Sequence, residues 1–149
     1  MEHYRDVFDA QFTQTDAMAG LRRAAFEHFA ARGFPTQRDE PWKYTNLRRL
    51  LSRRFQPAQG AALNTQQPLW LQGGNRIVLA NGQYSSALSS PTVQPPGLTM
   101  LTLAKWIAND PTDAAAYLAT TLTDDTSALE ALNLAFCQDG VVIHLADDV

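Results

Sequence analysis

The sequence lacks the residues on which several common kinds of function depend. Its 149 residues include one cysteine, Cys137, so an internal disulfide is excluded and a reducing compartment suits the chain. Its three histidines, His3, His28 and His144, lie far apart and show none of the usual spacings of a metal site. It also has no glycine-rich phosphate loop, no Gly-x-Ser-x-Gly nucleophile motif and no paired-carboxylate pattern. We therefore expect no catalytic residue, no metal ligand and no cofactor-binding residue in this chain.

Long apolar runs are missing as well. No stretch approaches the roughly 18 apolar residues of a membrane span. The first residues, Met1–Asp6, are polar and of mixed charge, without the apolar region of a secretory signal. The sequence therefore predicts a cytoplasmic protein that does not contact a membrane.

What the sequence does have is an uneven distribution of charge. Residues 1–54 hold ten Lys or Arg and seven Asp or Glu, whereas residues 55–149 hold two and eight. The first part is therefore basic and the second acidic. A basic half can bind nucleic acid, bind an acidic protein partner, or attract the acidic part of its own chain, and we favour the last two explanations. The candidate partner surface consists of Arg48, Arg49, Arg53 and Arg54.

The first half of the chain is predicted to be helical. Residues 16–32 place Met18, Leu21, Ala25 and Phe29 on one stripe, with Arg22, Arg23 and Glu27 off it, and Gly33 is a natural helix end. A shorter helix is expected over residues 6–12. Another should begin at Thr45 or Asn46, present Leu47, Leu50 and Leu51 on its apolar side, and end at Pro57.

The second half mixes strands and helices. Residues 76–80 and 83–88 are predicted to form a hairpin around Asn81-Gly82, the preferred pair for a type I′ turn. Helices are expected over residues 101–109, 113–120 and 127–138, a strand over 141–145, and irregular segments over 57–68 and 93–97. The last strand either pairs with the hairpin or leads into more sheet. The predicted fold class is α+β, a mainly helical small domain with a short hairpin and a C-terminal strand.

The segment over residues 33–47 is the most informative part of the sequence. It combines a helix end, two prolines, the triplet Trp42-Lys43-Tyr44 and a new helix start. Aromatic residues in such a connection usually pin it onto the core, and this structural clamp is the favoured interpretation. A partner surface is the second interpretation, and an aromatic and basic surface for nucleic acid is the third.

Three segments together resemble the N-terminal region of the SufD proteins, members of the SufB/SufD family. The first is Gly-Phe-Pro-Thr-Gln-Arg-Asp-Glu-Pro-Trp-Lys-Tyr-Thr over residues 33–45. The second is the strand and Asn-Gly turn over residues 77–84, and the third is Ala-Leu-Asn-Leu-Ala-Phe-Cys-Gln-Asp-Gly-Val-Val-Ile over residues 131–143. The residues that match the first motif are Gly33, Pro35, Thr36, Arg38, Glu40, Trp42, Lys43, Tyr44 and Thr45. Its Trp-Lys-Tyr-Thr element favours SufD over SufB.

This resemblance implies a role in iron-sulfur cluster assembly. Proteins of this kind are considerably longer and continue into a β-helix core, so residues 1–140 would be the N-terminal domain and residues 141–149 the start of that core. The parent protein would act in the SufBCD complex as a non-catalytic scaffold with SufB and SufC, SufC hydrolysing ATP and a cysteine desulfurase delivering sulfur. The cluster-related positions of the family lie in the core, and none is carried onto a residue here. The alternative is a small adaptor domain that binds an acidic protein partner through its basic helices.

Overall fold

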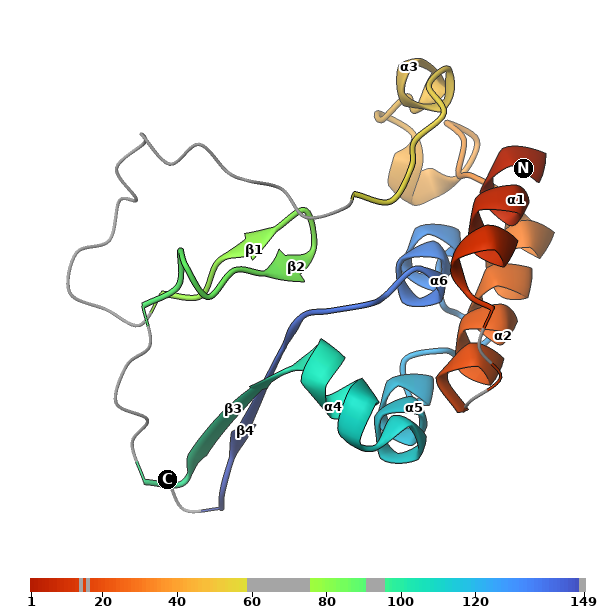
Figure 1. Ribbon diagram of the computed structural model, residues 1–149. Coiled ribbons are helices and arrows are strands. Elements are labelled where there is room, and N and C mark those ends of the chain that lie inside the picture. Colours follow the sequence, from red (N-terminus) through yellow and green to blue (C-terminus); the bar gives the residue numbers. More distant parts are fainter. Residues whose placement is uncertain (14, 16, 59–75, 91–95, 148–149) are drawn as a thin grey trace. The chain divides into compact units, whose positions relative to one another are not determined.

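The computed structural model describes residues 1–13, 15, 17–58, 76–90 and 96–147, and its elements are helices and two small antiparallel sheets (Figure 1). The predicted α+β fold class is therefore confirmed. The chain divides into two compact units. Unit 1 contains residues 1–57 and 110–137, and unit 2 contains residues 58–109 and 138–149. The predicted irregular segments lie largely outside the described residues, at positions 59–68 and 93–95.

Unit 1 is helical. Its elements are α1 (Glu2–Gln11), α2 (Ala17–Arg32), the short 3-10 helix η1 (Glu40–Trp42), α3 (Arg48–Leu51), α5 (Pro111–Ala119) and α6 (Ala128–Ala135). Helix α2 packs against both α5 and α6, which return from a distant part of the sequence. The predicted helices over 16–32 and 113–120 are thus confirmed, and the one expected over 6–12 is longer and begins at Glu2.

Aromatic rings fill the core of unit 1. The rings of Phe8 from α1 and Phe26 from α2 stack with their centroids 4.6 Å apart, and Phe136 meets Phe8 edge-on at 5.8 Å. Phe29, also fully buried, lies at 6.0 Å from Phe26. Small residues of α6, including Ala131 and Ala135, let this helix approach α2 closely. Burial of these rings is therefore the main source of stability in unit 1.

The predicted apolar stripe of α2 is largely correct, but it misplaces Arg22. Met18, Ala25 and Phe29 are buried as expected, whereas the Arg22 side chain, expected off the stripe, is only 6% exposed. Its guanidinium donates two hydrogen bonds, of 3.2 and 3.1 Å, to the carbonyl of Cys137 and lies 4.7 Å from the ring of Phe12. An arginine can be buried in this way because its charge faces a carbonyl oxygen and an aromatic ring.

Helix α6 begins with a capping box. The Ser127 hydroxyl accepts a hydrogen bond from the Glu130 N–H, and the Glu130 carboxylate accepts one from the Ser127 N–H at 2.8 Å. The predicted start at residue 127 is therefore correct. The predicted end is not, since α6 finishes at Ala135 and the following Phe136 turns into the core.

The helix expected after Asn46 is much shorter than predicted. Helix α3 contains four residues, and Leu50 and Leu51, expected on its apolar side, are exposed, as is Phe55 beyond its end. Arg49 and Arg53 would be one turn apart in a longer helix and would repel each other. A short helix also needs packing to persist, and these apolar side chains are left at the surface.

Unit 2 contains the predicted hairpin. Strands β1 (Leu79–Ala80) and β2 (Gln83–Tyr84) pair antiparallel around Asn81 and Gly82, which both have positive φ, 49° and 81°. These angles fit the type I′ turn that the Asn-Gly pair predicts. The ladder is shorter than expected, although Arg76 and Ser90 add an isolated bridge beyond it.

The partner of the last strand is a strand that the sequence analysis missed. β4 (Val141–Leu145) has the predicted bounds, but it pairs antiparallel with β3 (Leu98–Thr102) and not with the hairpin. Helix α4 (Leu103–Asn109) follows β3 directly, so Leu101, expected inside a helix, lies in a strand. The run Leu-Thr-Met-Leu-Thr is compatible with a helix and with a strand, and pairing with β4 makes it a strand.

Asp139 connects the parts of unit 2. One carboxylate oxygen accepts the N–H of Tyr84 from β2 at 2.8 Å, and the other accepts the N–H of Ala104 in the first turn of α4 at 3.1 Å. The carboxylate sits at the positive end of α4, where a negative charge is favourable. Two of the three segments that carry the family resemblance, the hairpin and the Asp-Gly-Val stretch, are thus joined by this side chain.

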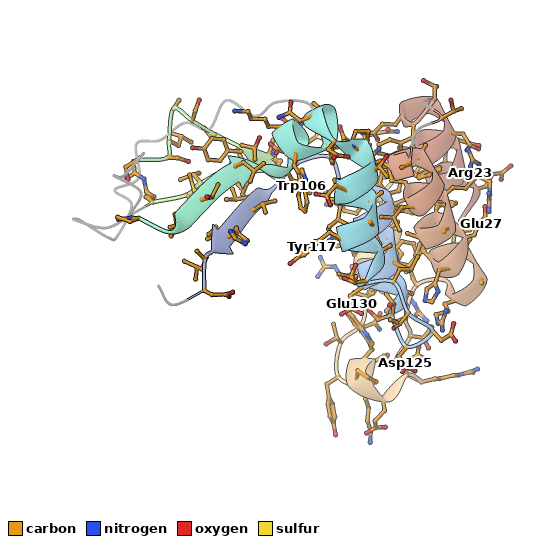
Figure 2. The ribbon with its side chains drawn as sticks, turned by 90° about the horizontal axis from the view of Figure 1, so that it is seen from below. Arg23, Glu27, Trp106, Tyr117, Asp125 and Glu130 are labelled. Carbon is orange, nitrogen blue, oxygen red and sulfur yellow. The ribbon has the colours of Figure 1, made fainter. Side chains whose placement is uncertain are left out.

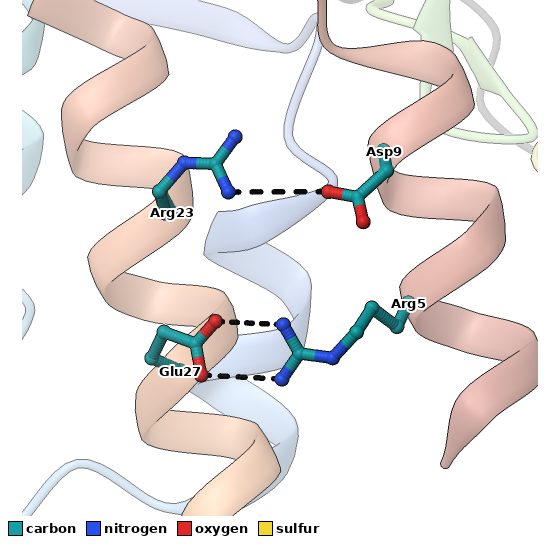
Figure 3. Close-up of polar contacts among 4 residues, drawn as sticks. All are labelled: Arg5, Asp9, Arg23 and Glu27. Atoms are coloured by element: carbon teal, nitrogen blue, oxygen red, sulfur yellow. Dashed lines mark hydrogen bonds and ion pairs between the residues drawn. The ribbon is translucent and has the colours of Figure 1, made fainter.

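Two ion pairs join α1 to α2 on the outer side of unit 1 (Figure 3). Arg5 contacts both carboxylate oxygens of Glu27, at 2.8 and 3.2 Å, and Arg23 faces Asp9 at 3.9 Å. Arg23 and Glu27 are one turn apart and lie on one side of α2 (Figure 2). The hydrogen bonds from Arg5 are the main reason that the pKa of Glu27 lies below its ordinary value.

No helix in the described segments combines the length and the apolar character that crossing a bilayer requires.

Replacement of Phe26 by alanine should destabilise the protein strongly. The ring is fully buried in the aromatic core, and such truncations typically lower the free energy of unfolding by about 3–5 kcal/mol. Urea denaturation followed by circular dichroism measures this loss. Tyr44→Ala is the matched control, because its ring is 91% exposed and its removal should change the free energy of unfolding by less than about 0.5 kcal/mol. Equal losses in the two variants would contradict this description of the core.

The contribution of the Arg5–Glu27 pair should depend on pH. Because the pKa of Glu27 is lower in the folded state, the pair stabilises the protein above the ordinary glutamate pKa of about 4.3, and this effect disappears as the pH falls through the folded value. The thermal midpoint of Glu27→Gln should therefore lie below that of the wild type near neutral pH, and the two should converge in acid. Asp125→Asn serves as the control, since the Asp125 side chain is exposed and makes no hydrogen bond within the described residues. A difference for Glu27→Gln that persists in acid would refute the assignment.

Candidate functional site

The segment that follows α2 is held in shape by its own polar groups. The Asp39 carboxylate accepts hydrogen bonds from the N–H of Thr36 at 2.7 Å and from its hydroxyl at 3.1 Å. The backbone bond is the main reason that the pKa of Asp39 lies below its ordinary value. Farther along, the Gln37 amide donates to the carbonyl of Lys43, and the Asn46 amide donates to the Gln37 side chain. The turn is therefore ordered although most of it is exposed.

The Trp-Lys-Tyr triplet lies at the end of η1, which Pro41 helps to start. Trp42 is half-buried, whereas Tyr44 is almost fully exposed. The Lys43 ammonium lies 4.0 Å from the Glu40 carboxylate and 5.7 Å from the centre of the Tyr44 ring. Tyr44, one of the residues proposed as a structural clamp, thus has its ring exposed to solvent. Its role in a partner surface stays a prediction.

The residue that fastens this segment to the core is Phe34, which the sequence analysis did not single out. Its ring centre lies 5.0 Å from that of Phe29 and 5.2 Å from that of Tyr4. Gly33, with a φ of 71°, ends α2 and donates its N–H to the carbonyl of Phe29 at 2.7 Å. An apolar residue directly after such a glycine commonly contacts the last turn of its helix. That rule, applied to Gly33-Phe34, is the signal that could have identified the clamp.

The basic residues proposed as a partner surface lie together on and after α3. Arg48, Arg49, Arg53 and Arg54 are all exposed. The Asn46 side chain accepts the N–H of Arg48 at 2.9 Å just before the helix, but α3 begins at Arg48 with Leu47 as its capping residue, later than the predicted start at Thr45 or Asn46. The end of the segment is tied to α1, because the His3 ring contacts the carbonyl of Phe55 at 2.8 Å. An open pocket of about 540 Å³ is lined by Arg49, Leu50, Ser52, Arg53 and Phe55.

The histidines and the cysteine are dispersed in structural positions. His28 binds the carbonyl of Thr126 at 2.8 Å, and the carbonyl of Cys137 receives the Arg22 bonds. His144 lies exposed on β4. Across the described residues, no three His, Cys, Asp or Glu side chains form a group that could hold a metal ion. Iron-sulfur clusters are held mainly by several cysteine thiolates, and a chain with one cysteine does not offer such a set.

The geometry thus describes a surface suited to contacts with another molecule. Its parts are an ordered turn with an exposed tyrosine, and a basic segment with an open pocket, both within residues 33–55 of unit 1.

Comparison with known proteins adds the family. The search of curated proteins and the search of solved structures each found no match. The family model described as the SufBD protein N-terminal region matches residues 2–67 and 73–149, and so covers all three segments on which the resemblance rests. The chain belongs to the SufB/SufD family, of which it carries the N-terminal region.

Proposed function

We propose that this chain is the N-terminal domain of a SufD-like subunit and acts as a non-catalytic part of the scaffold on which the SufBCD complex assembles iron-sulfur clusters. The observation that carries the proposal is the family match over nearly the whole chain. The family model covers SufB and SufD together. The choice of SufD rests on the resemblance of Trp42-Lys43-Tyr44-Thr45 to the SufD motif.

The proposed partners are SufB and SufC, which this domain would reach as part of the complete subunit in the cytoplasm. The nascent cluster is the product of the complex, and ATP is hydrolysed by SufC. A cysteine desulfurase would deliver the sulfur. In this scheme the domain supplies contact surface and no reacting group, in keeping with a single cysteine in its sequence.

A second candidate function is an adaptor domain that binds an acidic protein partner. The observation in its favour is the exposed basic segment at Arg48, Arg49, Arg53 and Arg54. The two functions are compatible, since a scaffold subunit also recruits proteins.

The proposed function is tested by isolating the protein from its native host with an affinity tag. SufB and SufC should be recovered with it in comparable amounts, and deletion of its gene should lower the activity of iron-sulfur enzymes such as aconitase while leaving metal-free enzymes unchanged. If SufC were recovered together with a different SufD protein, the chain described here would be identified as the SufB-like subunit. Recovery of neither SufB nor SufC, with unchanged aconitase activity in the deletion strain, would refute the proposal.

A further inference from the structure

Basic and acidic residues are separated more completely along this sequence than the division at residue 54 indicates. Residues 41–109 contain seven Lys or Arg and no Asp or Glu, and residues 110–149 contain eight Asp or Glu and no Lys or Arg. Five of the seven basic residues, Lys43, Arg48, Arg49, Arg53 and Arg54, fall within twelve positions. The pocket beside α3 therefore lies in a stretch of chain that has no acidic residue of its own.

The arginines of this stretch differ from several of those elsewhere in unit 1. Arg5 pairs with Glu27, Arg22 binds the carbonyl of Cys137, and Arg32 binds the carbonyl of Asp124. By contrast, the guanidinium groups of Arg48, Arg49, Arg53 and Arg54 make no ion pair and no hydrogen bond to any described residue. Their charges are therefore available to a ligand, although acidic residues of the same unit could have neutralised them.

The pocket combines these charges with exposed apolar surface. Leu50 and Phe55, which line it together with Arg49, Ser52 and Arg53, are 48% and 45% exposed. Large apolar side chains left at the surface beside a hollow are typical of a binding surface. The backbone around them is fixed, since the Ser52 hydroxyl donates to the carbonyl of Arg49 at 2.9 Å and His3 holds the carbonyl of Phe55. The charged and apolar groups of the pocket are therefore presented by one short segment of backbone.

We propose that this pocket binds an acidic segment of a partner protein, with an apolar side chain seated between Leu50 and Phe55 and neighbouring carboxylates on Arg49 and Arg53. Charge complementarity selects the acidic residues, because two guanidinium groups that have no partner among the described residues border the hollow, and each can take a carboxylate through two parallel hydrogen bonds. The apolar lining selects a segment that also carries Leu, Phe or a similar residue.

Other anionic ligands fit this pocket less well. Binding of nucleic acid without sequence preference uses a groove that follows many phosphates, whereas two arginines border this hollow. Binding to an anionic membrane uses a long helix with separate basic and apolar faces, whereas α3 has four residues. The inference rests on the second candidate function, the adaptor role, which it makes specific to this pocket, and it does not depend on the assignment to SufD.

The proposal is tested with the complete 149-residue chain and three fluorescent peptide libraries, measured by anisotropy at physiological salt. The first library alternates Glu or Asp with Leu or Phe, the second replaces the apolar positions by Ser, and the third replaces the acidic positions by Lys. The first library should contain the tightest ligands. Their affinity should fall by at least about tenfold in the double variant Arg49→Glu/Arg53→Glu, because attraction becomes repulsion at both contacts.

The matched control is the variant Lys105→Glu, compared with the single variant Arg53→Glu. It reverses the same amount of charge at one exposed position outside the pocket and should bind the first library almost as the wild type does, whereas Arg53→Glu should bind it more weakly. Circular dichroism and thermal melting of both variants show that they remain folded, as surface substitutions of this kind allow.

Four results would overturn the proposal. They are equal binding of the Ser library, equal weakening in the control variant, absence of binding to any library, and tighter binding of single-stranded DNA or of phosphatidylserine vesicles that is lost in Arg49→Glu/Arg53→Glu. Each of these outcomes leaves the recovery of SufB and SufC untouched, so the two proposals fail independently.

Discussion

Unit 1 depends on the burial of one face of α2 against α6. Phe26 and Phe29 supply the apolar surface, and the alanines of α6 allow the close approach that brings Phe136 into contact with Phe8. Arg22 secures the same junction with its bonds to the carbonyl of Cys137, which lies just beyond the end of α6. Helix α1, the Phe34 clamp and the polar turn after it are all arranged around this pair of helices. The exposed basic segment is not required for packing, because the core forms without it.

Local patterns in the sequence predict those parts of the structure that local interactions determine. The stripe on α2, the helix end at Gly33, the capping residue Ser127 and the Asn81-Gly82 turn are each specified by a few neighbouring residues, and the structure has them. The errors concern interactions between distant positions. Arg22 is polar and was expected at the surface, but its partner is the carbonyl of Cys137, 115 positions away. The strand Leu98–Thr102 carries no clear periodicity and is defined by its pairing with β4.

The candidate site shows the same division. Its residues could be listed from the sequence, since the aromatic triplet and the cluster of arginines stand out by composition. The sequence alone does not show which of these residues have a structural role and which are exposed. Phe34 holds the segment to the core, Asp39 and Gln37 shape the turn, and Tyr44 and the arginines remain exposed. The helix expected to run on to Pro57 ends at Leu51, and Leu50 and Leu51 are not packed into the core. Their exposure turns a predicted structural face into a candidate binding surface.

The construction of unit 1 from two separated stretches of chain has a consequence for its biosynthesis. The ribosome releases α1 and α2 long before α6, because 105 residues separate Arg32 from Cys137. At a translation rate of about 5–20 residues per second, the aromatic face of α2 waits on the order of ten seconds for its partner. During this interval the nascent chain exposes Phe26 and Phe29 to solvent. A chaperone that shields apolar segments would therefore act on this protein while it is still attached to the ribosome.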